Sequence, residues 1–246
     1  MTNETVQLLQ SHRSIRRYTD EVLPPQMLEQ ILQSAQWAPS SHHVQAYSII
    51  VVKDEEKRKR LAELCGQSFI GTSPAFLVFC ADFHRLKLVS DMHGTEFTLG
   101  EPEDLLVGAV DTALAAQNVM IAARSFGLGG VMIGGIRNHP EEVCEILDLP
   151  QYTMPIMGMS LGFPAEEPWQ KPRLPQEVVI QEDSYRTEHL YAGLEEYESS
   201  SADYYVRRTN GKQTAGWTKQ MAEYFATARR ANIRAFVEKQ GLLVKR

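Results

Sequence analysis

The stretch DLLVGAVDTALAAQNVMIAARSF, residues 104–126, decides the fold of this 246-residue chain. Its alanines and leucines favour a helix, and apolar residues occur on nearly all sides, so we expect the helix to run through the core. Asp111, Gln117 and Asn118 interrupt the apolar tract, which is typical of a buried helix rather than a membrane span. Gly127 follows and predicts that the helix ends there.

The segments on both sides of this helix alternate between helical patterns and short apolar runs. The alternation predicts helices packed around one sheet in three layers, and it favours parallel strands. A short first helix should turn Val6 and Leu9 inward, and the next helix should lie between Pro25 and Pro39. The strands are expected at residues 47–52, 75–81, 131–136 and 154–162. Further helices are expected at 54–64 and from residue 140. A last helix, at about 218–236, should follow a polar loop at 198–216.

The composition is that of a soluble globular protein, with 43% hydrophobic and 23% charged residues. A net charge of −6 argues against a nucleic-acid-binding protein. The first residues lack a basic start and a long apolar run, so no signal peptide is expected. Cys65, Cys80 and Cys144 are too far apart for a metal site and too few for a disulfide framework, which predicts reduced thiols in the cytoplasm.

The charge divides the chain into two segments. Residues 184–246 carry 11 Lys/Arg and 7 Asp/Glu, a net charge of +4, and hold six of the nine tyrosines. Residues 1–183 have a net charge of −10. We therefore expect a core at 1–183 and a distinct C-terminal arm at 184–246.

Two basic clusters have the chemistry of phosphate sites. His12, Arg13, Ser14 and Arg16 lie within five residues, just past the first helix, and guanidinium groups offer planar sets of donors that suit phosphate. The alternative is a solvated basic turn. In the sequence KPRLP, residues 171–175, the prolines impose an extended backbone, so the two cations point the same way and form a rigid pair.

Two polar segments next to expected strands could contact a heterocycle. Ser40, Ser41 and Gln45 precede the first strand and could donate hydrogen bonds to the edge of a heterocycle. The alternative is that they are only the polar residues that follow the end of a helix. The adjacent histidines at 42 and 43 lack metal-ligand spacing, so no metal is expected. Gly134 and Gly135 follow Ile133 at a strand end, where a ligand can approach the backbone and its N–H groups.

The remaining cluster is polar and cationic, and the chain lacks the motifs of direct side-chain catalysis. Arg207, Arg208 and Lys212 fall in the expected loop and could grip a second phosphate, or be merely solvated. The glycines at 127–130 close a helix rather than open one, so they form no dinucleotide fingerprint. No GxSxG motif occurs, and no cysteine has the sequence context of a nucleophile. This profile indicates that a bound cofactor performs the chemistry.

In their shared order, these clusters resemble the FMN-dependent nitroreductase superfamily, and more specifically its NADPH-preferring branch of nitroreductases and flavin reductases. The resemblance implies an α+β fold with a mostly antiparallel central sheet, against the parallel pairing favoured above. It also implies a homodimer in which C-terminal arms wrap the partner and two FMN sites lie at the interface. The segments that carry the resemblance are residues 12–16, 38–45, 66–70, 79–82, 111–118, 133–138 and 171–175.

The resemblance also assigns residues to FMN. Arg16 would lie near the pyrimidine edge, where negative charge grows on reduction. Gln67 would contact the flavin edge, and the Gly135 N–H would lie near N5. The phosphate and ribityl chain would be held by His12, Arg13, Ser14, Lys171 and Arg173; contacts from the partner subunit would come from Ser40, Ser41 and Gln45; and the backbone against the ring would be that of Ile133, Gly134 and Gly135.

The implied activity is a two-step exchange through one site. NADPH gives hydride to the flavin, and an acceptor (free flavin, a nitroaromatic or a quinone) then takes the electrons, so no side chain need act as nucleophile or base. Phe69 would border the substrate pocket, and Arg208 with Arg207 or Lys212 would grip the NADPH 2′-phosphate, although Lys212 stands where the family often has Arg. The alternative function is that of a flavin-binding sensor or carrier without physiological turnover.

Overall fold

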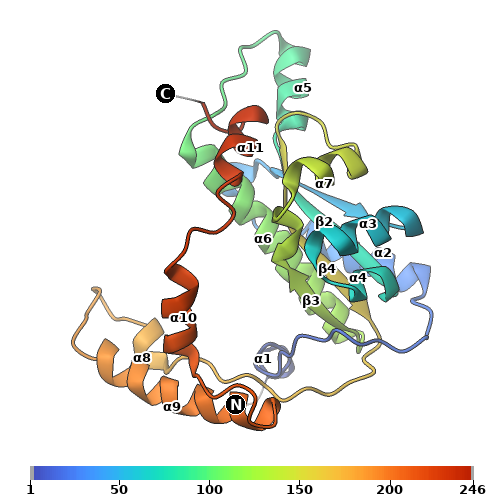
Figure 1. The fold of residues 1–246 in the computed structure, drawn as a ribbon. Helices are drawn as coiled ribbons and strands as arrows, with labels where there is room; N and C mark the ends of the chain where they lie inside the picture. Colours follow the sequence, from blue (N-terminus) through green and yellow to red (C-terminus); the bar gives the residue numbers. More distant parts are fainter. Residues whose placement is uncertain (1–2, 245–246) are drawn as a thin grey trace. The chain divides into compact units, whose positions relative to one another are not determined.

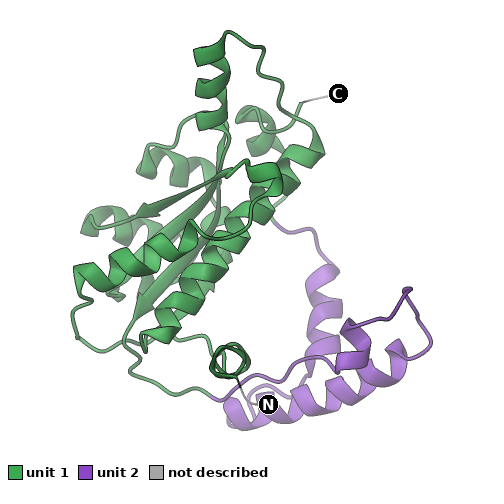
Figure 2. Ribbon diagram, turned by 180° about the vertical axis from the view of Figure 1, so that it is seen from behind, with its two compact units in different colours: residues 1–168, 230–246 green, residues 169–229 purple. Residues whose placement is uncertain are grey.

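The computed structural model describes residues 3–244, and the chain forms two compact units. The first contains the residues up to Pro168 together with those from Arg230 onwards, and the second is Trp169–Arg229 (Figure 2). These units differ in extent from the segments 1–183 and 184–246 that the charge distribution suggests. The last helix returns to the first unit.

The first unit is built on a four-stranded sheet with the strand order β1-β2-β4-β3 (Figure 1). Its strands are β1 (Tyr47–Val51), β2 (Ala75–Asp82), β3 (Gly129–Ile133) and β4 (Thr153–Gly162). All three strand pairs are antiparallel. The parallel pairing favoured by the helix–strand alternation is therefore wrong, and the antiparallel sheet implied by the resemblance is confirmed.

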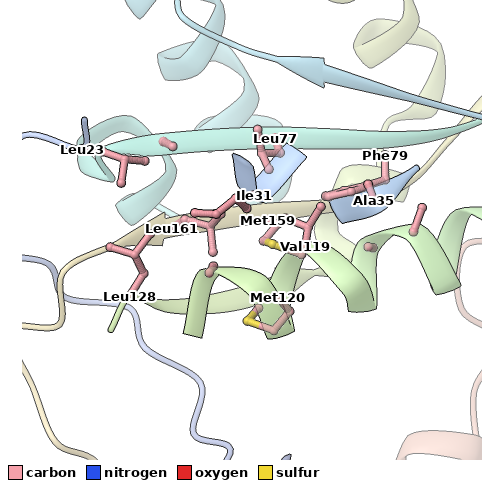
Figure 3. Close-up of a cluster of buried hydrophobic side chains, with 14 of the residues drawn as sticks. Leu23, Ile31, Ala35, Leu77, Phe79, Val119, Met120, Leu128, Met159 and Leu161 are labelled. Carbon is pink, nitrogen blue, oxygen red and sulfur yellow. The ribbon is translucent and has the colours of Figure 1, made fainter. Parts of the chain in front are cut away.

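The long helix α6 (Pro102–Ser125) lies in the core as predicted. Pro102 occupies its first turn, and the carboxylates of Glu101 and Asp104 form a reciprocal capping box. Val119 and other residues of α6 pack on one face of the sheet, as Figure 3 shows together with Ile31 of α2 (Pro25–Ala35). Within residues 3–244, α6 alone is long and apolar enough to cross a membrane by length and composition.

The opposite face of the sheet carries α3 (Glu55–Cys65), α4 (Phe69–Thr72) and α7 (Pro140–Leu147). Alternate residues of β2 serve the two faces: Phe79 packs toward α6, and Phe76 packs with Leu61 and Ile70 of α3 and α4. The predicted three-layer arrangement is therefore confirmed. The turn η2 (Gly134–Arg137) follows β3 directly and packs on the same face of the sheet as α3, α4 and α7.

Several helical expectations are wrong. On α1 (Glu4–Gln10), Val6 and Leu9 are 46% and 43% exposed instead of turned inward. The helix α5 (His84–His93) was not expected, and none of its residues is buried. The helix expected at 218–236 is two helices, α10 (Trp217–Phe225) and α11 (Ile233–Lys239), with Arg230 at φ 49° between them. A left-handed residue cannot continue a right-handed helix, which explains the break.

The second unit contains α8 (Gln176–Val179), α9 (Leu190–Arg208) and α10. The polar loop expected at 198–216 is wrong over its first half, because α9 continues to Arg208. Tyr197, Ser201 and Tyr205 recur every four residues and are buried on one side of α9. That stripe stabilises a helix whose other residues are mostly polar.

Candidate functional site

The basic segment after α1 lies against β3. The Ile15 N–H donates to the Gly130 carbonyl oxygen at 3.0 Å, and Ser14 forms a parallel bridge with Gly130. A Cβ atom on Gly129 would lie 2.5 Å from Cγ1 of Ile15, so the close approach requires glycine there. The segment is therefore fixed at the side of the sheet, with His12 half-buried and Arg16 exposed.

Two carboxylates compensate the charge of this segment. Oε1 of Glu166 accepts hydrogen bonds from the backbone N–H groups of Arg16 at 2.8 Å and Arg17 at 3.2 Å. Oε1 of Glu167 lies 3.2 Å from Nη1 of Arg13. Because the Glu167 side chain is 83% exposed, this ion pair is weak and leaves Arg13 open to another anion.

Arg13 also has a donor that the protein does not use. Within residues 3–244, its Nε is buried without a hydrogen-bond partner. The Arg13 residue lines a pocket of about 590 Å³ together with Ser11, Arg124, Glu166 and Glu167. Burial and, secondarily, the nearby charge of Arg13 lower the pKa of the Arg124 guanidinium. An anion bound here would offset the repulsion between the two cations and satisfy the free N–H. The donors therefore fit a phosphate group.

The loop between α2 and β1 is held in an unusual conformation. His42, His43 and Gln45 have φ values of 47°, 58° and 54°, in the left-handed region. Such a conformation costs about 1–2 kcal/mol per non-glycine residue. Ser40 Oγ stabilises it by donating to Oδ2 of Asp111 on α6 at 2.8 Å and accepting the Gln45 N–H at 2.6 Å.

Arg85 at the start of α5 holds the other side of this loop. Its Nη2 donates to the Gln45 carbonyl oxygen at 2.9 Å, and its Nε lies 3.6 Å from Oδ2 of Asp82. The Gln45 backbone is thus bonded through both its N–H and its carbonyl. The side chains of Gln45 and Ser41 are exposed and point away from the core.

Packing explains the glycines at the end of β3. A Cβ atom on Gly135 would lie 2.5 Å from the carbonyl oxygen of Cys65 at the end of α3. A Cβ atom on Gly134 would lie 3.3 Å from Nη2 of Arg137 and 3.9 Å from Nη2 of Arg230. The turn therefore lies between a helix end and two guanidinium groups, with Ile133 buried before it.

The contact between Gly135 and Cys65 brings η2 to the segment that contains Gln67. Gly66 ends α3 at φ 64°, and the Gln67 N–H bonds back to Ala62 at 2.9 Å. The half-buried Gln67 side chain lines a pocket of about 590 Å³ over α3 and α4. Phe69 follows as the first residue of α4 and packs against the core cluster on that side of the sheet.

Lys171 and Arg173 lie in the second unit, on an extended segment that packs on α9. The Tyr197 hydroxyl donates to the Pro172 carbonyl oxygen at 2.8 Å, and Lys171 Nζ lies 5.2 Å from the centre of the Tyr205 ring. The pKa of Tyr197 is raised by burial, which Arg173 partly opposes. Both cationic residues are exposed, and Nη1 of Arg173 donates to the Lys171 carbonyl oxygen at 2.8 Å.

The second cationic group of this unit follows at the end of α9. Arg207 and Arg208 are exposed in its last turn, and Lys212 is exposed in the turn after it. Nη1 of Arg208 contacts the Tyr204 hydroxyl at 3.4 Å. The following turn is held by Glu198, whose carboxylate accepts the Gly216 N–H at 3.0 Å.

Sequence reasoning missed two residues that shape these sites. Arg230 Nε donates to Oδ1 of Asn138 at 3.0 Å, which fixes the second guanidinium beside η2. Its signal was an Arg-Arg pair inside a predicted helix, where the left-handed φ was not visible. The buried Asp111 was recognised as part of a motif but was given no role. The predicted cofactor roles of the other residues stay predictions.

The α+β fold, with an antiparallel sheet, a basic segment bridged to β3 and a glycine turn at the end of that strand, is that of nitroreductase-like proteins. The chain matches the nitroreductase family over residues 9–163 and the family's C-terminal domain over 171–245. It is 42% identical to an FMN reductase [NAD(P)H] of Bacillus subtilis, covering 99% of this chain and 100% of that one.

It is also 41% identical to an oxygen-insensitive NADPH nitroreductase of Salmonella typhimurium, covering 96% of this chain and 97% of the relative. The solved structure of NfrA2 from B. megaterium superposes with a TM-score of 0.96 at 40% identity and covers 100% of both chains. The chain therefore belongs to the nitroreductase family.

Proposed function

We propose that this protein is an NADPH-dependent oxidoreductase that binds FMN and reduces flavins, nitroaromatics or quinones in two steps. The observation that carries the proposal is the full-length match to a flavin reductase and a nitroreductase, joined to an anion pocket in which Arg13 keeps a buried N–H unpaired. When bound, FMN supplies the hydride acceptor and donor. The protein has to bind and orient it and to admit both substrates in turn.

The residues of the first unit divide this work by their chemistry. Arg13, with His12 and Ser14 beside it, supplies donors for the phosphate. The η2 turn offers its backbone to the ring, and its position is fixed by the close packing of Gly135 on the end of α3. Positive charge near the ring is provided by the exposed Arg16, and by Arg137 and Arg230 next to Gly134. Such charge stabilises the electron-rich reduced ring.

The second unit supplies the remaining cations. Lys171 and Arg173 sit on a segment made rigid by prolines and by the Tyr197 hydrogen bond, and the family resemblance assigns them to the FMN phosphate. Arg208, with Arg207 or Lys212, grips the 2′-phosphate of NADPH. None of these three exposed cations is among the residues assigned to FMN, so we expect that NADPH recognition can be removed without loss of FMN.

We also propose that the protein is a homodimer, with the C-terminal arm at 184–246 wrapping the partner and Ser41 and Gln45 facing the partner's FMN. Leu106, Val110 and Leu114 recur every four residues on α6 and are 60%, 51% and 37% exposed. An apolar stripe on a helix is typical of a covered interface. Val110→Glu should convert a dimer to monomer in sedimentation analysis; an unchanged mass would contradict the assignment of this face.

A cytoplasmic location is part of the same proposal. Cys65, Cys80 and Cys144 are free and buried. Burial raises the pKa of the thiols of Cys65 and Cys144 to about 12, so they stay protonated at neutral pH. Three free thiols suit a reducing compartment.

The test is the addition of NADPH to the purified yellow protein without oxygen. We expect the flavin absorbance near 450 nm to bleach and to return when an acceptor is added. A protein that keeps its colour would instead be a flavin-binding sensor or carrier. In Arg208→Ala/Lys212→Ala, KM for NADPH should rise at least tenfold while flavin content is unchanged, and an unaltered KM would reject the loop assignment.

A further inference from the structure

The carboxylate of Asp111 sits at the centre of the donor loop. The residue is 1% exposed, in the middle of α6, and accepts three hydrogen bonds from the loop. Oδ2 accepts the Ser40 hydroxyl at 2.8 Å and the Ala46 N–H at 3.0 Å, and Oδ1 accepts the Ser41 N–H at 3.0 Å. One side chain of the core helix thus holds both ends of a loop that contains three left-handed residues.

The proton count at Ser40 follows from these bonds. A serine hydroxyl has one proton, and that of Ser40 is donated to Asp111. Its oxygen also accepts the Gln45 N–H at 2.6 Å. Ser40 therefore has no proton to offer a cofactor. The Ser41 side chain is exposed, and the exposed Gln45 amide nitrogen contacts Nε2 of His43 at 3.3 Å but has two N–H groups, so it can still donate one of them.

We propose that Asp111 is the positioning residue of the donor loop: it fixes the backbone of residues 40–46 so that Ser41 and Gln45 present their donors to FMN, and Ser40 is a link in the loop rather than a flavin contact. This inference rests on the proposed FMN function. It reassigns one residue that the sequence placed among the cofactor contacts.

The geometry requires a carboxylate. Both oxygens of Asp111 accept backbone N–H groups, one from Ser41 and one from Ala46. Asparagine has the same shape, but in either orientation its NH₂ group faces one of those N–H donors. The loop would then lose at least one anchor and face an unpaired buried donor. Asp111→Asn is therefore a small change in volume that specifically loosens the loop.

Thr112 provides the matched control. It is also fully buried on α6, one residue further on, and its hydroxyl donates to the Gly108 carbonyl oxygen at 2.6 Å within the helix. Thr112→Val removes a buried hydroxyl from the same helix, and the hydrogen bond that it breaks lies within the helix. It reports the effect of lowered stability alone.

The experiment measures the FMN dissociation constant, the visible absorbance of bound flavin, and KM and kcat with NADPH. In Asp111→Asn we expect the FMN dissociation constant to rise at least tenfold and the spectrum of the bound flavin to change. In Thr112→Val the dissociation constant should stay within twofold of the wild-type value, and the spectrum should not change. Ser40→Ala should weaken binding less than Asp111→Asn. The double variant Ser40→Ala/Asp111→Asn should bind no more weakly than Asp111→Asn, because both changes break one network.

Two results would overturn the inference: equal FMN affinity in Asp111→Asn and Thr112→Val, or additive losses in the double variant, as expected if Ser40 contacts FMN directly. If Asp111→Asn does not fold, hydrogen exchange on the wild-type protein decides. The amides of Ser41 and Ala46 should be protected at least a hundredfold with or without FMN, and rapid exchange of both would refute the anchor. A wild-type protein that binds no FMN would instead refute the proposed function.

Discussion

Replacing Gly135 by alanine tests the close contact between η2 and the end of α3. The new Cβ atom would lie 2.5 Å from the carbonyl oxygen of Cys65 and 3.1 Å from its Cα. Both atoms belong to the backbone, so no flexible side chain can move aside. Overpacking of this kind costs about 1–3 kcal/mol. For a chain of this size, a loss of that order lowers Tm by roughly 2–12 °C.

Two other glycines separate this clash from backbone strain. Gly71 lies in α4 with no atom within 4 Å of a new Cβ, so Gly71→Ala should gain up to about 1 kcal/mol from helix propensity. Gly66 is equally open but has φ 64°, so Gly66→Ala should lose about 1–2 kcal/mol through strain alone. Gly135 does not have a positive φ, so a loss of stability in Gly135→Ala would come from the clash with Cys65 and not from backbone strain.

The assay is thermal unfolding followed by circular dichroism at one fixed FMN concentration, since bound ligand raises Tm. Flavin content after gel filtration supplies a second readout. Gly135→Ala should lose flavin as well as stability, because it displaces the turn that we propose to contact FMN, whereas Gly71→Ala should keep both. A Gly135→Ala protein with wild-type Tm and full flavin content would show that the packing argument is wrong.

Three further predictions concern side chains away from the cofactor. Cys65, Cys80 and Cys144 should resist iodoacetamide at pH 8 in the native protein and all react after unfolding, as counted by mass spectrometry, because burial raises their pKa values. Asp54→Ala removes the N-cap of α3, which accepts the Lys57 N–H at 2.8 Å, and should cost about 1 kcal/mol in urea unfolding. Burial raises the pKa of Glu198, but hydrogen bonds from Thr218 and Gly216 outweigh it and leave that pKa lowered. The Glu198 carboxylate therefore stabilises the fold at pH values above its unfolded pKa, and this stabilisation is lost as the pH falls through the lower, folded pKa. Glu198→Gln should lower Tm at pH 7, and the difference in Tm from wild type should shrink as the pH is lowered.

The positions of β1, β2 and β4 could be predicted, but not the strand directions. The strand expected at 131–136 is wrong over its second half, because β3 covers Gly129–Ile133 and Gly134–Arg137 form the turn η2. The runs at 47–52 and 75–81 nearly coincide with β1 and β2, since continuous β-branched and aromatic runs are typical of buried strands. β2 is buried at all eight positions because both of its faces are covered. A central antiparallel strand covered on both faces has the same pattern as a parallel one, so the direction came only from the family resemblance.

The site could be predicted where its chemistry is contiguous in sequence. The residues at 12–16 and 133–135 are recognisable because several donors or glycines stand together. Asp111 and Arg230 could not be found in this way, since Asp111 bonds to Ser40 71 residues away and Arg230 bonds to Asn138 92 residues away. An aspartate within an apolar helix shows only that some partner must exist, because a buried charge needs donors.

The net charge of −6 does not oppose binding of an anionic cofactor, because the charges that matter act at short range. Charges on the surface are screened within about 8–10 Å at physiological salt. Around the basic segment, Oε1 of Glu166 accepts backbone N–H groups, and its Oε2 lies 3.9 Å from Nε of the exposed Arg17, so Glu166 compensates charge at Arg17 rather than at Arg13. Glu167 does meet Arg13, but from a mostly exposed position. A phosphate, with up to two negative charges and three acceptor oxygens, can compete with that exposed carboxylate for the Arg13 guanidinium.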